Sequence, residues 1–142
     1  MLYRSPFKVD NPGKTYKELQ KSSGVIVFGT GNLGNIVLAA LNKANINILC
    51  LTDNNKSRWG KVYNGHKVIP PSDLKNTNNE IPILVASDLT FPYIHRQLRD
   101  MKLTNVLDCD FIFSELNLTL KECNIYWSKE KVRQKVDAYM YD

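Results

Sequence analysis

Short apolar runs alternate with segments of helical periodicity along most of the chain. The runs have the length and composition of buried strands and lie at 25–28, 46–51, 81–86 and 104–108. After the first run, five apolar residues recur at the spacing of one helix face: Leu33, Ile36, Val37, Ala40 and Leu41. A second such pattern follows the run at 81–86 and comprises Ile94, Leu98 and Met101. This alternation predicts an α/β fold with a parallel sheet flanked by helices.

The segment after the second run departs from this alternation. Asn64-Gly65 separates two short alternating runs at 61–63 and 66–69, and Asn-Gly in that position is a strong hairpin signal. We therefore expect a small β-hairpin insertion after the second strand, projecting near Asp53, in place of a second crossover helix. Ser72 is the expected N-cap of the short helical turn that follows.

The most informative motif is Gly29-Thr30-Gly31-Asn32-Leu33-Gly34, which lies where the first strand passes into the first helix. In this context Gly29 allows a tight turn, Gly31 lets a phosphate approach the backbone, and Gly34 lets the helix pack closely on the sheet. The free N–H groups of the helix start then face the anion. We expect a single Rossmann-like domain over residues 24–142, preceded over 1–23 by an arm and a short helix at 14–21.

Polar residues at the ends of the apolar runs extend this candidate site. Asp53 follows the second run, nineteen residues after Gly34, where a carboxylate can accept hydrogen bonds from a ribose diol. Ser87 follows the third run, so its hydroxyl can bind a phosphate or a sugar, whereas Asp88 is at least as well suited to capping the next helix. The expected nucleotide-binding residues are Gly29, Gly31, Asn32, Leu33, Gly34, Asp53, Asn54 and Ser87.

The net charge of +5 is concentrated near the start of the sequence. Residues 1–24 carry five basic and two acidic side chains, whereas the other 118 residues carry fourteen basic and twelve acidic ones. Because no aromatic pattern accompanies the basic residues, a solvated segment is favoured over a nucleic-acid site. No run approaches the twenty apolar residues of a membrane span and no signal-peptide pattern is present, so we expect a cytoplasmic protein without membrane contact.

The reactive side chains do not form a recognisable catalytic set. Cys50, Cys109 and Cys123 are odd in number and widely spaced, which favours buried reduced thiols over disulfides or metal ligands. For His66 and His95 a surface or capping role is favoured over general-base chemistry. Trp59 is expected to cover the hairpin rather than to stack on a base.

Redox enzymes that act on sugar nucleotides commonly use a tyrosine with a lysine four residues later. At that offset the sequence has Gln20 after Tyr16, Gln97 after Tyr93 and Glu130 after Tyr126. We therefore assign no catalytic residue and no metal ligand, and we expect the isolated chain to bind its ligand without turning it over.

Several segments together resemble the small Rossmann-like domains of bacterial surface-glycan pathways. They are the loop at 28–34, the acidic turn at 52–55, the Trp59-Gly60 turn, the Asn64-Gly65 hairpin and the exit at 68–71. Such domains form the nucleotide-sugar-binding N-terminal part of sugar acyltransferases and modules attached to FkbM-type methyltransferases. The segment at 108–113 and a final helix, expected from Ser128, look closer to the methyltransferase-associated version. The resemblance implies a nucleotide-linked ligand at Gly29, Gly31, Asn32, Leu33 and Asp53.

The expected function is therefore nucleotide or nucleotide-sugar binding in bacterial sugar or polysaccharide biosynthesis, accessory to a separate catalytic domain or protein. The ligand is either NAD or a nucleoside diphosphate sugar. One alternative is a subunit of an NAD-dependent sugar-nucleotide oxidoreductase or epimerase, and another is an interaction domain with a vestigial cleft. The sequence leaves open the base, the sugar and the oligomeric state, including a homodimer.

Overall fold

The computed structural model describes residues 12–77, 79–87, 90–109 and 112. Its strands are β1 (Val25–Phe28), β2 (Ile48–Thr52), β3 (Val62–Tyr63), β4 (His66–Ile69), β5 (Ile83–Val85) and β6 (Val106–Asp108). Its α-helices are α1 (Pro12–Lys21), α2 (Asn32–Lys43) and α3 (Phe91–Asp100), and its 3-10 helices are η1 (Lys56–Arg58) and η2 (Pro71–Asn76). Within these ranges, every helix falls short of the length and apolar character that a bilayer crossing requires.

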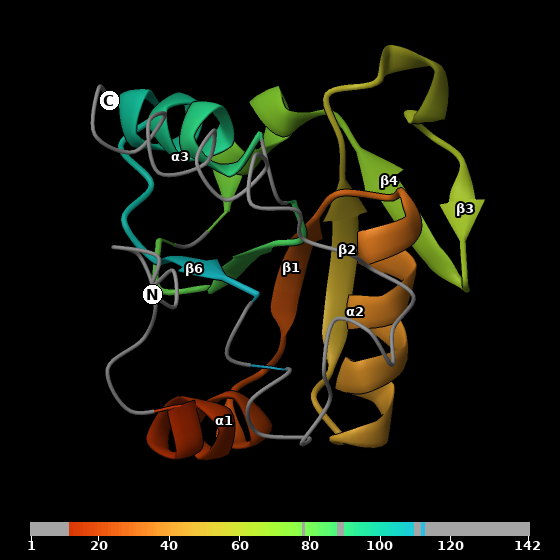
Figure 1. Cartoon of the computed structure of the whole chain (residues 1–142). Helices are drawn as coiled ribbons and strands as arrows, with labels where there is room; N and C mark the ends of the chain where they lie inside the picture. Colours follow the sequence, from red (N-terminus) through yellow and green to blue (C-terminus); the bar gives the residue numbers. More distant parts are fainter. Residues whose placement is uncertain (1–11, 78, 88–89, 110–111, 113–142) are drawn as a thin grey trace, which may run out of the picture.

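The six strands form one sheet in the order β3-β4-β2-β1-β5-β6 (Figure 1). Neighbouring strands are parallel except for β3 and β4, which form an antiparallel hairpin. All four residues of β1 are buried, because β1 lies between two strands and both of its faces are covered. The predicted α/β class is confirmed, and the four apolar runs contain the parallel strands β1, β2, β5 and β6.

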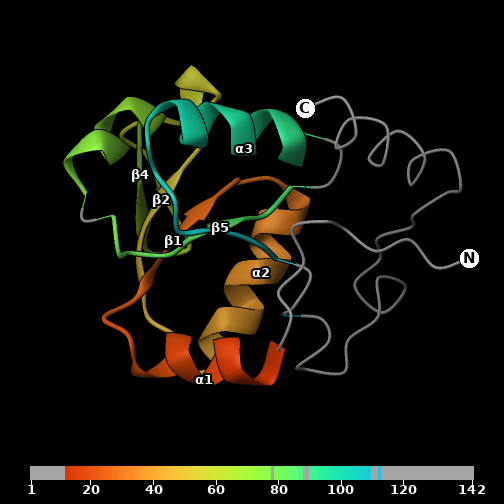
Figure 2. The ribbon, with the colours of Figure 1, turned by 90° about the vertical axis from the view of Figure 1, so that its left-hand side faces the viewer.

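Two hydrophobic cores lie on opposite faces of this sheet, one of which is covered by α2 and the other by α3 (Figure 2). On one face, Val25 and Val27 of β1 belong to the core that includes Val37 and Leu41 of α2. On the other face, the alternate residues of β1 belong to the core that includes Leu74 of η2 and residues of α3. Since successive strand residues point to opposite faces, the unbroken apolar run of β1 is what a doubly covered strand requires.

The hairpin forms where the sequence predicts it, but it does not simply project from the domain. Asn64 and Gly65 both have positive φ, 52° and 82°, as the tight hairpin turn requires. However, β4 also pairs in parallel with β2, with Leu51 opposite Val68. Burial of Val68, which is 0% exposed, favours this arrangement, so the hairpin extends the sheet in the place of the missing helix-connected strand.

Several predicted boundaries need correction. Ser72 is not an N-cap, because η2 begins at Pro71 with Pro70 as its N-cap, and the fixed φ of proline suits a first helical position. Met101 follows α3 rather than lying within it. The first helix begins at Pro12, two residues earlier than expected. The expected arm, Asp88, Cys123 and the final helix lie outside the described residues, apart from the arm's last two residues.

Candidate functional site

Two glycines of the Gly29–Gly34 motif are required by the fold itself. Gly29 has φ +122°, and a Cβ atom there would lie 2.6 Å from the carbonyl oxygen of Ala86. A Cβ atom on Gly34 would lie 2.3 Å from the carbonyl oxygen of Gly29. The roles predicted for these two glycines, a tight turn and close helix packing, are therefore confirmed.

Gly31 differs from both of its neighbours in the motif. Its backbone has φ −82° and ψ −158°, which any residue can adopt, and a Cβ atom there would have no neighbour within 4 Å. The fold therefore accepts a side chain at this position. The absence of one leaves open space beside the start of α2.

The start of α2 retains donors for an anion. Gly31 is the N-cap and offers no side-chain hydrogen bond, and the first turn of α2 carries no acidic residue. The first helical bond runs from the N–H of Asn35 to the carbonyl oxygen of Gly31. Within the described part of the chain, the backbone N–H groups of residues 31–34 donate to no acceptor. Four free N–H groups at a helix start attract negative charge.

Asp53 ties the end of β2 to this loop. One oxygen, Oδ2, accepts hydrogen bonds from the backbone N–H and the hydroxyl of Thr30, at 2.9 and 2.7 Å. The other oxygen, Oδ1, accepts a hydrogen bond of 2.8 Å from the N–H of Asn55. Because a carboxylate offers about four lone-pair positions, Oδ1 retains acceptor capacity. The ribose contact predicted for Asp53 is compatible with this geometry and stays a prediction.

Arg58 of η1 was not identified from the sequence, yet it contacts the glycine loop, which comprises residues 29–34. Its Nη1 donates to the carbonyl oxygen of Thr30 at 2.8 Å and to the hydroxyl oxygen of Thr30 at 2.7 Å. The guanidinium lies 5.4 Å from the ring centroid of Tyr63, a distance at which cation–π attraction operates. A signal was available, because loops that follow adjacent parallel strands meet at one edge of a sheet, and Arg58 comes soon after Asp53.

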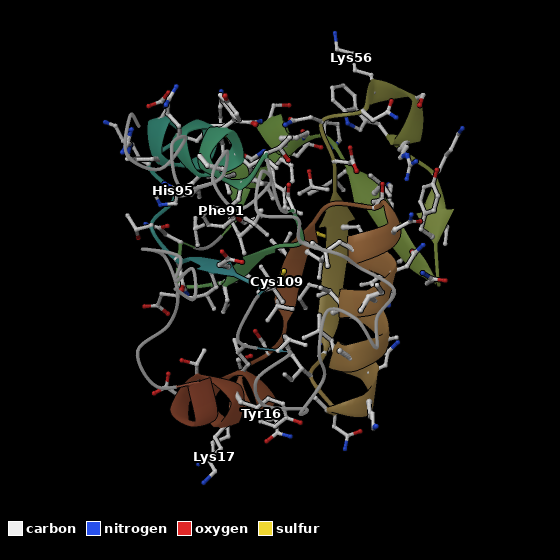
Figure 3. The ribbon with its side chains drawn as sticks, in the orientation of Figure 1. Tyr16, Lys17, Lys56, Phe91, His95 and Cys109 are labelled. Atoms are coloured by element: carbon white, nitrogen blue, oxygen red, sulfur yellow. The ribbon has the colours of Figure 1, made fainter. Side chains whose placement is uncertain are left out.

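Trp59 anchors the turn after β2, and its expected place over the hairpin stays a prediction. Its indole N–H donates to the carbonyl oxygen of Asp53 at 2.7 Å, and its half-buried ring packs against the core on the α2 side of the sheet. These contacts of Trp59 fix the turn after β2 that carries Arg58. Lys56, at the start of η1, instead extends away from the sheet (Figure 3).

Ser87 and Asn54 lie at the same end of the sheet as the glycine loop. Just after β5, the N–H of Ala86 donates to the carbonyl oxygen of Phe28 at the end of β1. Ser87 is the next residue, and its hydroxyl is hydrogen-bonded to the hydroxyl of Thr90. Asn54 is hydrogen-bonded through its side chain to Gln97 of α3. The topology thus brings the predicted site residues together at the carboxyl ends of β1, β2 and β5.

The histidines lie outside this cluster of contacts. His66 is the first residue of β4 and pairs with Tyr63, and His95 of α3 stacks on Phe91 with ring centroids 5.9 Å apart (Figure 3). Cys50 and Cys109 are reduced thiols. Cys109 is buried, as predicted, whereas Cys50 is only half-buried, and burial raises the pKa of the Cys50 thiol. Among the described residues, His, Cys, Asp and Glu side chains form no group of three that could hold a metal ion.

The hairpin contains a tyrosine followed four residues later by a lysine, Tyr63 and Lys67, in addition to the three tyrosines that lack one. In the hairpin, Lys67 pairs with Val62 and Tyr63 pairs with His66. Because directly paired residues share a face and adjacent ones do not, Tyr63 and Lys67 lie on opposite faces of the hairpin. They therefore do not form the proton relay of a sugar-nucleotide oxidoreductase.

Comparison with known proteins identifies the family of this domain. No curated protein matches the chain significantly. The model of the family described as C2185-like, N-terminal, matches residues 21–106, which include the glycine loop, Asp53, Arg58 and Gln97 and exceed half of the chain. The chain therefore belongs to the C2185-like N-terminal family.

Proposed function

We propose that this domain binds a nucleotide through its phosphates at the start of α2. Gly31 is the observation that carries the proposal, because the fold itself does not require glycine there. Open space, an ordinary backbone conformation and free N–H groups coincide at this one residue. A phosphate that approaches the backbone closely explains why a side chain is absent.

The charges around the loop support an anionic ligand. Arg58 uses Nη1 to hold Thr30, while an arginine side chain has five N–H donors in all. Its half-buried guanidinium thus brings positive charge and spare donors to the loop, where they add to the partial positive charge of the helix start. Asp53 then accepts the ribose hydroxyls through Oδ1, and Ser87 is available to the rest of the ligand.

We infer that the ligand is NAD or a nucleoside diphosphate sugar, and that the domain serves bacterial sugar or polysaccharide biosynthesis beside a separate catalytic domain or protein. The resemblance to nucleotide-sugar-binding domains supports this context. The opposite orientations of Tyr63 and Lys67 count against the oxidoreductase alternative. A cytoplasmic location accords with the reduced thiols of Cys50 and Cys109.

The test is a thermal-shift and calorimetric screen with NAD, NADP, UDP, UDP-sugars, GDP-sugars, CDP-sugars and coenzyme A. A ligand at about a hundred times its Kd stabilises the protein by roughly 2.7 kcal/mol. Gly31→Val should remove this stabilisation because its side chain fills the phosphate space. Asn42→Val, at an exposed position near the other end of α2, is the matched control and should retain it.

Two results would overturn the proposal. One is that no nucleotide in the screen stabilises or binds the wild-type protein. The other is that Gly31→Val binds as tightly as the wild type, which would mean that the phosphates do not occupy the space beside Gly31. The thermal midpoint of the ligand-free variant checks that the fold is retained.

A further inference from the structure

Two side-chain amides form a reciprocal pair above the sheet. Asn54 Nδ2 donates to Gln97 Oε1, and Gln97 Nε2 donates to Asn54 Oδ1, each at 2.9 Å. The two residues are 43 positions apart in the sequence. The pair therefore connects the turn after β2 directly to α3.

The position of this pair is defined by the sheet order. Asn54 follows Asp53 at the carboxyl end of β2, whereas Gln97 belongs to the helix that follows β5. Because β1 lies between β2 and β5, the pair joins elements on either side of β1 at its carboxyl end. The helix that contributes Gln97, α3, covers the face of the sheet opposite α2 (Figure 2). A nucleotide with phosphates at Gly31 and ribose at Asp53 would extend its base toward Asn54.

The chemistry of the pair matches that of a nucleobase edge. Each carboxamide presents a donor and an acceptor side by side, and the pair uses one of each from both residues. A base edge with an adjacent donor and acceptor forms the same two-bond pattern with an amide, as adenine does through N6 and N7. Asn54 is exposed and Gln97 is half-buried, so an arriving base can reach the amides.

We propose that Asn54 and Gln97 form a base-reading site, in which the base opens the reciprocal pair and takes its place on one of the two amides. This inference rests on the proposed function, since it requires the phosphates and ribose to occupy the neighbouring loop. It assigns ligand selectivity to a contact between the turn after β2 and α3 rather than to the glycine loop.

The test compares ligands with and without a base. Calorimetry measures the Kd of ADP, GDP, UDP, CDP and inorganic pyrophosphate for the wild type and for the double variant Asn54→Ala, Gln97→Ala. At least one nucleoside diphosphate should bind the wild type more tightly than pyrophosphate. In the double variant, the Kd of that nucleotide should rise by about tenfold or more, whereas the Kd of pyrophosphate should stay unchanged.

A spectroscopic readout and a control make the test specific. The side-chain NH₂ signals of Asn54 and Gln97, assigned from single variants, should shift on addition of the preferred nucleotide but not of pyrophosphate. Gln20→Ala removes an amide that donates to the carbonyl oxygen of Ala44 on α2's C-terminal side and should leave both affinities unchanged.

The outcomes separate this inference from the proposed function. If neither pyrophosphate nor any nucleotide binds the wild type, the proposed function fails and the base-reading site fails with it. If pyrophosphate binds but no base improves affinity, only the base-reading site is overturned. The same holds if the double variant weakens nucleotide and pyrophosphate equally, since the amide pair would then act on the loop's structure alone.

Discussion

Thr30 donates its backbone N–H and its hydroxyl to the same carboxylate oxygen of Asp53, at 2.9 and 2.7 Å. The threonine is only 4% exposed, and its two oxygens accept hydrogen bonds from Arg58. The glycine loop is therefore held between an acidic and a basic residue of the turn that follows β2. Stability and ligand binding are coupled at this point, because Asp53 is both a loop anchor and the expected ribose acceptor.

Asp53→Ala should therefore destabilise the protein even without ligand. The buried N–H and hydroxyl of Thr30 would lose their acceptor, and an unsatisfied buried donor costs about 1–3 kcal/mol. Urea denaturation measures the change in the free energy of unfolding. Asp73→Ala removes the same charge from an exposed position and should have little effect. Equal stability of the two variants would show that the Asp53 contacts do not hold the loop.

The glycines of the motif should differ in their tolerance of a methyl group. Gly34→Ala should destabilise by about 1–3 kcal/mol through overpacking, because its Cβ would lie against the backbone of Gly29. Gly31→Ala should cost at most about 1 kcal/mol, the usual scale of an N-cap change. Thermal unfolding of both variants measures the difference. A larger loss for Gly31→Ala would contradict the assignment of open space beside that residue.

Whether the sequence predicts a contact depends on how far apart in the sequence the two contacting residues are. The Asn64-Gly65 turn and the roles of Gly29 and Gly34 depend on residues close in sequence or on the general geometry of a strand-to-helix turn. The Arg58–Thr30 and Asn54–Gln97 contacts join residues 28 and 43 positions apart. Such contacts depend on which strands become neighbours, and apolar periodicity does not specify the partner of a polar side chain.

The same limitation explains why the sequence predicts a projecting hairpin, whereas the hairpin extends the sheet. The Asn-Gly signal determines a turn, but it does not determine whether a neighbouring strand is available to extend the ladder. Here β4 pairs with the edge of β2 that does not face β1. This pairing places the turn that carries Arg58 beside the glycine loop, which the expectation of a projecting hairpin did not anticipate.

Asp53 should make the site select against a 2′-phosphate. The carboxylate of Asp53 and the 2′-phosphate would bring two negative groups together at the ribose. NAD should therefore bind more tightly than NADP in calorimetry. Asp53→Asn keeps an acceptor for Thr30 but removes the negative charge, so the difference between the Kd values of NAD and NADP should become smaller. Tighter binding of NADP than of NAD by the wild type would reject the ribose assignment.

Arg58→Gln should weaken phosphate binding more than it weakens folding. A hydrogen bond to a charged group contributes about 1.5–3 kcal/mol, so the Kd of inorganic pyrophosphate should rise at least about tenfold. The wild-type affinity should also fall with added salt, and less steeply in the variant. Arg99→Gln changes an exposed charge on α3 and is the control. Equal affinities of the two variants would exclude Arg58 from the phosphate site.

The chain alone should bind nucleotide sugars without converting them. Tyr63 and Lys67, which have the spacing of a proton relay, lie on opposite faces of the hairpin, and the described part of the chain contains no group of three potential metal ligands. Incubation with UDP- and GDP-sugars, with and without NAD, followed by mass spectrometry, should show unchanged ligand, as should Gly31→Val. A new sugar product formed by the wild type well above the Gly31→Val level would reveal a missed active site, and Ser87, Asp88 and His95 would be the first residues to substitute.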